Sequence, residues 1–177
     1  MSIRPWRVLE SNYLRKNVRI DVCETSNGKI IEPLVLEYGT WVTIVALTKQ
    51  QEVLLIKQYR HGAQKILWEL PGGAVNEDEV PIVAAKRELL EETGYSSNKW
   101  VLLGSSRPNP AIQSNTIYHY LALDCEKTAE TSFDENESIA TRLLPEKEVE
   151  NLIMKGTISH SLVVAAFYYL KVFSERS

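Results

Sequence analysis

The sequence predicts an α/β protein, in which a mixed β-sheet carries helices on both faces as an α/β/α sandwich, preceded by an N-terminal β-hairpin extension. Three observations predict this class. Segments with strand-like apolar patterns recur between residues 16 and 144. A helical pattern over Pro81–Thr93 interrupts these strands. Two further helical patterns, Glu146–Met154 and Ser159–Phe173, follow the last strand, so we expect layers of helix around the sheet.

Composition limits the function classes. The 177 residues suit one domain with a substantial core, and 44% hydrophobic with 24% charged residues is typical of a soluble protein. A net charge of −3 gives no electrostatic footprint for nucleic acid. No apolar run approaches the ~20 residues of a membrane span, and the N-terminus lacks a signal-peptide pattern. Cys23 and Cys125 favour buried, reduced thiols, so we expect a cytoplasmic protein.

The first 40 residues are predicted to form the N-terminal β extension, and residues 41–177 the main domain. Residues before Lys16 fit either a flexible arm or a first strand. Lys16–Glu24 alternates apolar and charged residues, as a half-buried strand does. Asn27-Gly28 is a strong hairpin signal, and Pro33 in the returning segment Ile30–Tyr38 predicts an edge position or a bulge.

Trp41–Leu47 and Glu52–Tyr59 are predicted as core strands joined by a polar turn, because their apolar residues are nearly continuous. In a later strand, Thr116–Asp124, His119 falls on the same side as three aliphatic residues. The polar, acidic stretch Glu126–Ser138 has no apolar periodicity and is predicted to be a mobile loop. The remaining predicted strands are Lys65–Leu70, Trp100–Ser105 and Ile139–Leu144.

The predicted helix Pro81–Thr93 carries the functional signal. Pro81 fits the first helical turn, and Gly94 fits a left-handed residue that ends a helix. Glu88 and Glu92 are neighbours one turn apart, and Glu91 lies within about a quarter turn of both. Like charges near the C-terminal end of a helix repel one another and oppose the helix dipole. A hard divalent cation removes both penalties, because it prefers carboxylate oxygens.

The spacing around this helix is specific. Gly73, five residues, Glu79, seven residues and Arg87-Glu88-Leu89-x-Glu91-Glu92-x-Gly94-Tyr95 resembles the Nudix box at every position. Average composition gives such a match by chance on the order of 10⁻⁹ per window. The resemblance implies a Nudix hydrolase, which cleaves a nucleoside diphosphate linked to another moiety using Mg²⁺, with Mn²⁺ as a substitute.

The resemblance also implies roles for single residues. Glu88, Glu91, Glu92 and the backbone carbonyl of Gly72 are expected to hold the metal. Arg87 is expected to belong to the catalytic machinery, oriented by Glu79 or paired with Glu91. The loop Asp134–Ile139 resembles a segment of ADP-ribose pyrophosphatases whose first glutamate is the general base, which indicates Glu135, with Glu137 as the rival.

The sequence indicates the substrate less specifically than it indicates the reaction. Arg60, Trp68 and Glu69 lie in segments that resemble the substrate-binding lead-in of the family, and the ring of Tyr13 or Trp68 could stack on a base. Pro110 occupies the place of a proline found in ADP-ribose pyrophosphatases. In those enzymes an acidic segment usually accompanies this proline. This chain instead carries neutral hydrogen-bonding side chains in that region. These groups are Asn109, Gln113 and Asn115.

The predicted function is therefore hydrolysis of nucleoside diphosphate sugars, such as ADP-ribose, ADP-glucose or GDP-mannose, to a nucleoside monophosphate and a sugar phosphate. Two alternatives remain open: a Nudix hydrolase of dinucleoside polyphosphates or coenzyme A, and a nucleotide-sugar sensor without turnover. Nucleic acid and membrane partners are not expected. The N-terminal hairpin resembles a segment exchanged between subunits in dimeric ADP-ribose pyrophosphatases, so a homodimer is predicted.

Overall fold

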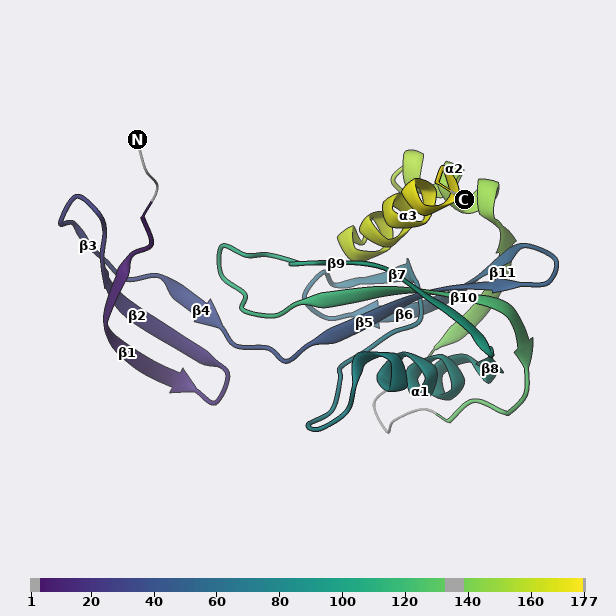
Figure 1. Ribbon diagram of the computed structural model, residues 1–177, viewed down its shortest axis with the longest axis horizontal. Helices are drawn as coiled ribbons and strands as arrows, with labels where there is room; N and C mark the ends of the chain where they lie inside the picture. Colours follow the sequence, from purple (N-terminus) through teal and green to yellow (C-terminus); the bar gives the residue numbers. More distant parts are fainter. Residues whose placement is uncertain (1–3, 133–138, 177) are drawn as a thin grey trace. The chain divides into compact units, whose positions relative to one another are not determined.

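The computed structural model describes residues 4–132 and 139–176. The chain divides into two compact units, Met1–Gly39 with Arg107–Thr116, and Thr40–Ser106 with Ile117–Ser177. The smaller unit contains the first four strands (Figure 1). The larger unit contains the remaining strands and the helices, and it carries the candidate site described below.

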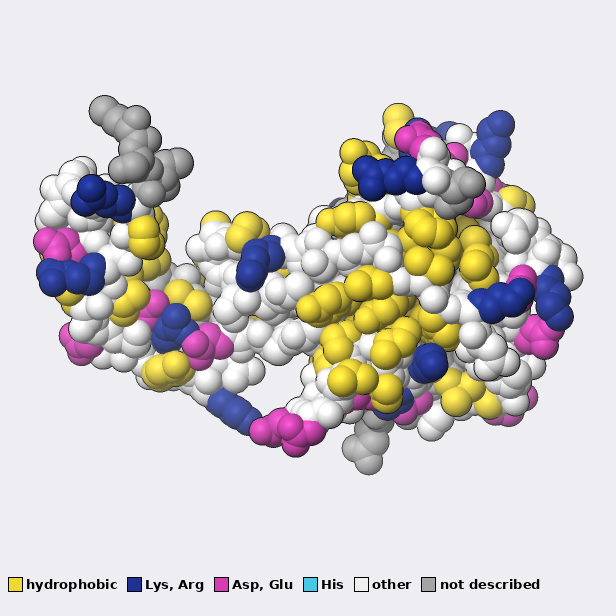
Figure 2. Space-filling view, viewed as in Figure 1, with side chains coloured by type: hydrophobic (Ala, Val, Ile, Leu, Met, Phe, Trp, Pro, Cys, Tyr) yellow, Lys and Arg dark blue, Asp and Glu magenta, His cyan; other side chains and the backbone are white. Residues whose placement is uncertain are grey.

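The smaller unit is a sheet organised around β2 (Val18–Glu24). This strand pairs antiparallel with β1 (Arg7–Arg15), and with the short strands β3 (Ile30–Ile31) and β4 (Leu34–Leu36). The returning segment is broken between β3 and β4, where Pro33 removes a donor, as the sequence predicts. Of the residues left open in the sequence, Arg7–Arg15 form a strand, β1. Hydrophobic side chains of this unit reach the surface among charged ones (Figure 2).

The loop Arg107–Thr116 belongs to the smaller unit, although it joins two strands of the larger one. Its backbone pairs with β4 because the amide of Leu36 donates to the carbonyl of Ile112 at 2.7 Å. The amide of Ser114 donates back to the Leu36 carbonyl at 3.1 Å. These pairings are long-range, and the composition of the loop does not predict them.

The larger unit holds a mixed sheet in the order β11-β6-β5-β10-β8, with β7 paired to β6 and β9 paired to β10. β5 and β10 run parallel, with Thr43 opposite His119, while the other pairs are antiparallel. The strands are β5 (Trp41–Thr48), β6 (Glu52–Arg60), β7 (Lys65–Glu69), β8 (Tyr95–Ser96), β9 (Lys99–Ser106), β10 (Ile117–Lys127) and β11 (Ala140–Pro145).

Helices cover both faces of this sheet, as the predicted sandwich requires (Figure 1). The helix α1 (Pro81–Thr93) buries Ala84, Ala85 and Leu89 against the side chains of β5 that include Ile44. On the other face, α2 (Glu146–Met154) and α3 (Ser161–Ser174) pack on alternate residues of β5 and β6. The buried residues of that second core are mainly aliphatic and include Val45, Leu55, Leu121, Val149, Val163 and Leu170.

The helix boundaries agree with the sequence patterns. α1 begins at Pro81 and ends at Gly94, whose φ of 73° is left-handed and whose amide donates to the Leu90 carbonyl at 2.8 Å. α2 matches its predicted range, and α3 begins two residues later than predicted, at Ser161. Within the described ranges, no helix combines the length and apolarity needed to cross a membrane.

The end of β10 differs from the prediction. The loop was expected from Glu126, whereas β10 continues to Lys127 and pairs there with β8. Asp124 has a φ of 53°, and the pairing register with β5 shifts between Ala122 and Cys125. This bulge breaks the alternation of side chains from which a strand is predicted. The strand continues beyond the bulge because Glu126 and Lys127 pair with β8.

Candidate active site

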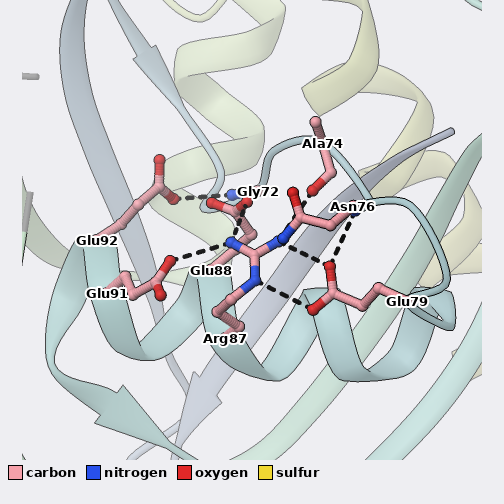
Figure 3. A network of polar contacts seen from close by, with 8 residues as sticks. All are labelled: Gly72, Ala74, Asn76, Glu79, Arg87, Glu88, Glu91 and Glu92. Carbon is pink, nitrogen blue, oxygen red and sulfur yellow. Dashed lines mark hydrogen bonds and ion pairs between the residues drawn. The ribbon is translucent and has the colours of Figure 1, made fainter. Parts of the chain in front are cut away.

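Arg87 is the centre of a network on the outer face of α1 (Figure 3). Its guanidinium donates to both carboxylate oxygens of Glu79, at 3.1 and 3.0 Å. One terminal nitrogen also donates to Glu88 at 2.8 Å and to Glu91 at 3.0 Å. The other terminal nitrogen donates to the Ala74 carbonyl at 3.0 Å. The sequence left pairing with Glu79 or Glu91 open, and the structure shows that both occur.

These contacts set the charge states of the network. Hydrogen bonds to Glu79, the largest cause, raise the pKa of Arg87 above its ordinary value. The Arg87 guanidinium in turn lowers the pKa of Glu79, and the backbone amide of Asn76 lowers it further. One cation therefore partly neutralises three carboxylates. Glu79 orients Arg87 and the preceding loop, as expected from the sequence.

The loop Pro71–Gly73 runs against β5 and places backbone groups beside α1. The carbonyl of Pro71 accepts from the Ile44 amide, and the carbonyl of Gly73 accepts from the Val42 amide, both at 2.9 Å. Between them, the amide of Gly72 turns to α1 and donates to Glu92 at 2.9 Å. The Pro71 and Gly73 carbonyls therefore each tie the loop to β5.

Both glycines lie where other groups approach the backbone closely. A Cβ on Gly72 would lie 2.1 Å from the Val42 carbonyl oxygen, and the φ of Gly72 is 153°. A Cβ on Gly73 would lie 2.5 Å from a carboxylate oxygen of Glu88. Gly72 thus lets the loop approach the backbone of β5, and Gly73 leaves room for the Glu88 carboxylate.

A cavity of about 730 Å³ opens beside this loop. Its walls come from β5, β6, β7, the glycine loop, α1 and the start of α3. The cavity brings together seven of the residues that the sequence predicts for the site. These are Arg60, Glu69, Gly72, Arg87, Glu88, Glu91 and Glu92.

Arg60 and Glu69 form a bidentate pair across β6 and β7, with donor–acceptor distances of 2.9 and 2.7 Å. The Glu69 side chain is only 5% exposed, whereas that of Arg60 is 45% exposed. The pair is present, and Arg60 still lines the cavity.

The other predicted substrate residues lie elsewhere. Trp68 is half-buried against the α2–α3 core, and the ammonium of Lys57 sits 5.1 Å from its ring centroid. Asn109, Gln113 and Asn115 belong to the smaller unit. The Asn109 carbonyl accepts from the amide of Gln113 at 2.8 Å. The roles of these four residues in binding stay predictions.

Glu135 and Glu137, the predicted general bases, lie outside the described residues. The chain on each side of them is placed. Ser132 lines the cavity, and its amide donates to the Glu91 carbonyl at 2.9 Å. On the other side, Ala140 pairs with Lys57 of β6.

Several cavity residues were not predicted. Thr43 lines the cavity from β5, and its hydroxyl contacts the ring of His119 at 2.6 Å. His160 precedes α3 and caps it, because its ring nitrogen accepts from the Leu162 amide at 3.3 Å. His61 lies in the turn between β6 and β7. The signal in the sequence for the contact between Thr43 and His119 is the place of His119 on the apolar side of a predicted strand.

The model of the NUDIX domain family matches residues 38–167 of the chain. This protein is a member of the Nudix family. It is similar to the methanol dehydrogenase activator of Bacillus methanolicus, with 29% identity over 88% of this chain and 84% of that protein. It is equally similar to the ADP-ribose pyrophosphatase of Mycobacterium tuberculosis, with 29% identity over 84% of this chain and 72% of that protein.

A solved structure shares the fold. The crystal structure of an ADP compounds hydrolase matches 99% of this chain and 97% of its own, with a TM-score of 0.86 and 22% identity. Together with the family match, this confirms the predicted α/β Nudix architecture with an N-terminal sheet. The protein is a Nudix hydrolase.

Nudix hydrolases generally use divalent metal ions, and such ions are held by oxygen ligands. Among the described residues, no three His, Cys, Asp or Glu side chains are arranged as a ready-made metal site. Arg87 occupies the space between Glu88 and Glu91, and Glu92 is bonded to Gly72. The donors are nonetheless all oxygens beside one cavity, which is the chemistry that Mg²⁺ or Mn²⁺ prefers.

Proposed function

We propose that this Nudix hydrolase is a metal-dependent pyrophosphatase that splits nucleoside diphosphate sugars into a nucleoside monophosphate and a sugar phosphate. The observation that carries the proposal is the set of acids around Arg87 on the wall of a cavity that also presents Arg60 and Glu69. The names of similar proteins support the same substrate class, since one is an ADP-ribose pyrophosphatase.

Glu88, Glu91, Glu92 and the Gly72 carbonyl are the residues that would hold Mg²⁺, with Mn²⁺ as a substitute. A bound metal neutralises phosphate charge and lowers the pKa of a bound water. The positive charge of Arg87 balances the negative charge of the carboxylates. Its planar guanidinium also orients them, because it donates to several acceptors at once. The Gly72 amide holds Glu92 at the edge of the cavity.

The attacking water must lose a proton, and we assign this step to Glu135, with Glu137 as the rival. The support is the resemblance of the loop and the position of Ser132, which lines the cavity a few residues before the loop acids. Glu135→Gln is expected to lower kcat by about 10²–10⁴-fold, the usual loss for a general base. Glu137→Gln is its matched control, and a larger loss in the control would transfer the role.

On the substrate side, Arg60 is proposed to contact a phosphate or ribose oxygen while Glu69 holds it in place. The neutral groups Asn109, Gln113 and Asn115 favour a broad sugar specificity. Asn115 is 3% exposed, and neither polar atom of its side chain has a hydrogen-bond partner among the described residues. The support for Trp68 is weaker, because its ring already packs on the core.

We also propose that the protein is a cytoplasmic homodimer with a dimerising N-terminal extension, residues 1–40, before the Nudix domain, residues 41–177. All nine residues of β1 are exposed within one chain, including Leu9 and Tyr13. Both cysteines are buried and free. Sedimentation equilibrium at micromolar concentration should give twice the chain mass of 20.2 kDa. A particle of the single-chain mass would rule out the dimer.

A substrate panel tests the proposed function. Hydrolysis of ADP-ribose, ADP-glucose, GDP-mannose, diadenosine polyphosphates and coenzyme A is measured with Mg²⁺ and with Mn²⁺. The readout is phosphate released by a phosphomonoesterase from the product. Preferred turnover of a nucleotide sugar supports the proposal. Preference for a polyphosphate or coenzyme A supports the first alternative, and binding without turnover of any compound supports a sensor.

A further inference from the structure

A buried histidine links the cavity to the interior of the larger unit. His119 has no exposed surface and lies in β10 between β5 and β9. Its Nδ1 is 2.6 Å from the Thr43 hydroxyl, and its Nε2 is 2.8 Å from the Ser106 hydroxyl. Three polar side chains from three strands therefore form one hydrogen-bonded chain.

The ring of His119 is fixed in orientation. It stacks on Tyr169 of α3, with centroids 5.2 Å apart and planes at 28°. The Tyr169 hydroxyl donates to the Ser105 carbonyl at 2.7 Å, which fixes the tyrosine in turn. Gly104 leaves room for this stack, because a Cβ there would lie 2.5 Å from the tyrosine ring.

The imidazole is neutral at physiological pH. Burial lowers the pKa of His119 from 6.5 to about 4. A neutral imidazole has one N–H donor and one acceptor nitrogen. Thr43 and Ser106 must therefore play opposite roles: one hydroxyl accepts from the ring and the other donates to it.

Thr43 is the member of the chain that lines the cavity. The pairings of Pro71 with Ile44 and of Gly73 with Val42 place Thr43 opposite Gly72. The backbone at Thr43 is so close that a Cβ on Gly72 would lie 2.9 Å from its Cα. The backbone of Thr43 therefore lies beside Gly72, whose carbonyl is one of the proposed metal ligands, and its side chain lines the same cavity as Glu88, Glu91 and Glu92.

We infer that the Thr43 hydroxyl donates a hydrogen bond to a phosphate oxygen of the substrate, and that His119 and Ser106 are positioning residues that hold it as a donor. Phosphate oxygens only accept, so Thr43 must direct its proton into the cavity. Its oxygen then accepts from Nδ1–H of His119, and Nε2 accepts from the Ser106 hydroxyl. The inference rests on the proposed function, because it takes a phosphorylated substrate as given.

Kinetics of matched threonine variants test the contact. Thr43→Val removes the hydroxyl at nearly constant shape and is expected to lower kcat/KM for the best nucleotide sugar by about 10–100-fold, the usual loss for a hydrogen bond to a charged group. Thr43→Ser should restore activity to within about 3-fold of wild type, since it keeps the hydroxyl. Thr48→Val removes a buried hydroxyl from the same strand outside the cavity and should leave kcat/KM unchanged.

The tautomer of His119 gives a readout that a purely structural role would not move. Ring ¹⁵N shifts are recorded on histidine-labelled protein, and the His119→Gln variant assigns the signal. With methylene-bridged ADP-ribose and Mg²⁺ bound at saturation, the ring should be in the form protonated at Nδ1. Ser106→Ala removes the donor to Nε2 and should lower the population of this tautomer without changing the cavity wall.

The possible outcomes distinguish failure of the inference about Thr43 from failure of the proposed function. A His119 ring protonated at Nε2 with the analogue bound, or equal kinetics for Thr43→Val and Thr48→Val, would overturn the inference while leaving the hydrolase in place. If wild type neither binds nor hydrolyses any nucleotide sugar, the proposed function fails, and the inference fails with it.

Discussion

Two polar clusters border the same cavity, and they compensate for burial in opposite ways. The cluster around Arg87 is charged and partly exposed, with one cation shared among Glu79, Glu88 and Glu91. The chain through His119 is neutral and buried, and each ring nitrogen faces a hydroxyl. Burying charge is costly unless it is paired, whereas a neutral polar group needs only its hydrogen bonds.

The difference indicates a division of labour. The charged cluster would exchange partners on binding the proposed metal, since a divalent cation would take the place of Arg87 beside Glu88 or Glu91. The neutral chain has no such freedom, because stacking and burial hold the His119 ring in place. We therefore expect charge removal to affect turnover, and changes in the neutral chain to affect stability and substrate orientation.

The largest effect is expected from Glu92→Gln. Glutamine keeps an oxygen that accepts from the Gly72 amide, so the loop stays in place while the charge is lost. We expect Mg²⁺-dependent kcat to fall by about 10²–10³-fold, the usual cost of removing a charge-stabilising group. Glu126→Gln is the control, because Glu126 is exposed and pairs only with Lys49 among the described contacts. A folded Glu92→Gln variant with nearly normal turnover would refute the metal assignment.

The next effect concerns the pH dependence of stability. The pKa of His119 is lowered by burial from 6.5 to about 4. Between these values the unfolded chain binds a proton that the folded chain does not, so the free energy of unfolding falls as pH drops from 6.5 to 4 and levels off below. The full loss is about 3 kcal/mol.

Urea unfolding of wild type and His119→Gln across this pH range measures the effect. Subtracting the two sets of unfolding free energies separates the contribution of His119 from that of Glu79. Because the pKa of Glu79 is lowered in the folded chain, its contribution to stability is lost in more acidic solution. The variant should show a flatter dependence between pH 6.5 and 4. Parallel curves for the two proteins would mean that His119 titrates normally in the folded state.

The smallest effect is expected from Gly73→Ala. The new methyl group would meet the Glu88 carboxylate, a side chain that can move, so the fold should persist. Mn²⁺ affinity, measured by titration calorimetry, is expected to fall by about 10-fold, because a displaced ligand binds less well. Gly39→Ala is the control, since a Cβ there meets nothing within 4 Å. Equal Mn²⁺ affinities for wild type and Gly73→Ala would mean that Glu88 takes no part in metal binding.

Much of the fold follows from local patterns in the sequence. The ends of α1 were predictable because Pro81 and Gly94 act through their own backbone geometry. The core strands were predictable from continuous apolar runs. The extension of β10 to Lys127 was not, because pairing with β8 across the sheet decides it.

The candidate site divides in the same way. The carboxylates of α1 were predictable, since their spacing alone places them on one helix face. The chain of Thr43, His119 and Ser106 was not, because its members come from three strands that meet only in the folded sheet. The backbone pairing of the loop Arg107–Thr116 with β4 depends on long-range contacts as well.

One crystallographic measurement tests the central claim most directly. Crystals of the protein with Mn²⁺ and methylene-bridged ADP-ribose are examined for anomalous scattering. Manganese is expected to be bound by Glu88, Glu91, Glu92 and the Gly72 carbonyl, next to the diphosphate. Manganese or diphosphate bound elsewhere, with Arg87 still bridging Glu88 and Glu91, would contradict it.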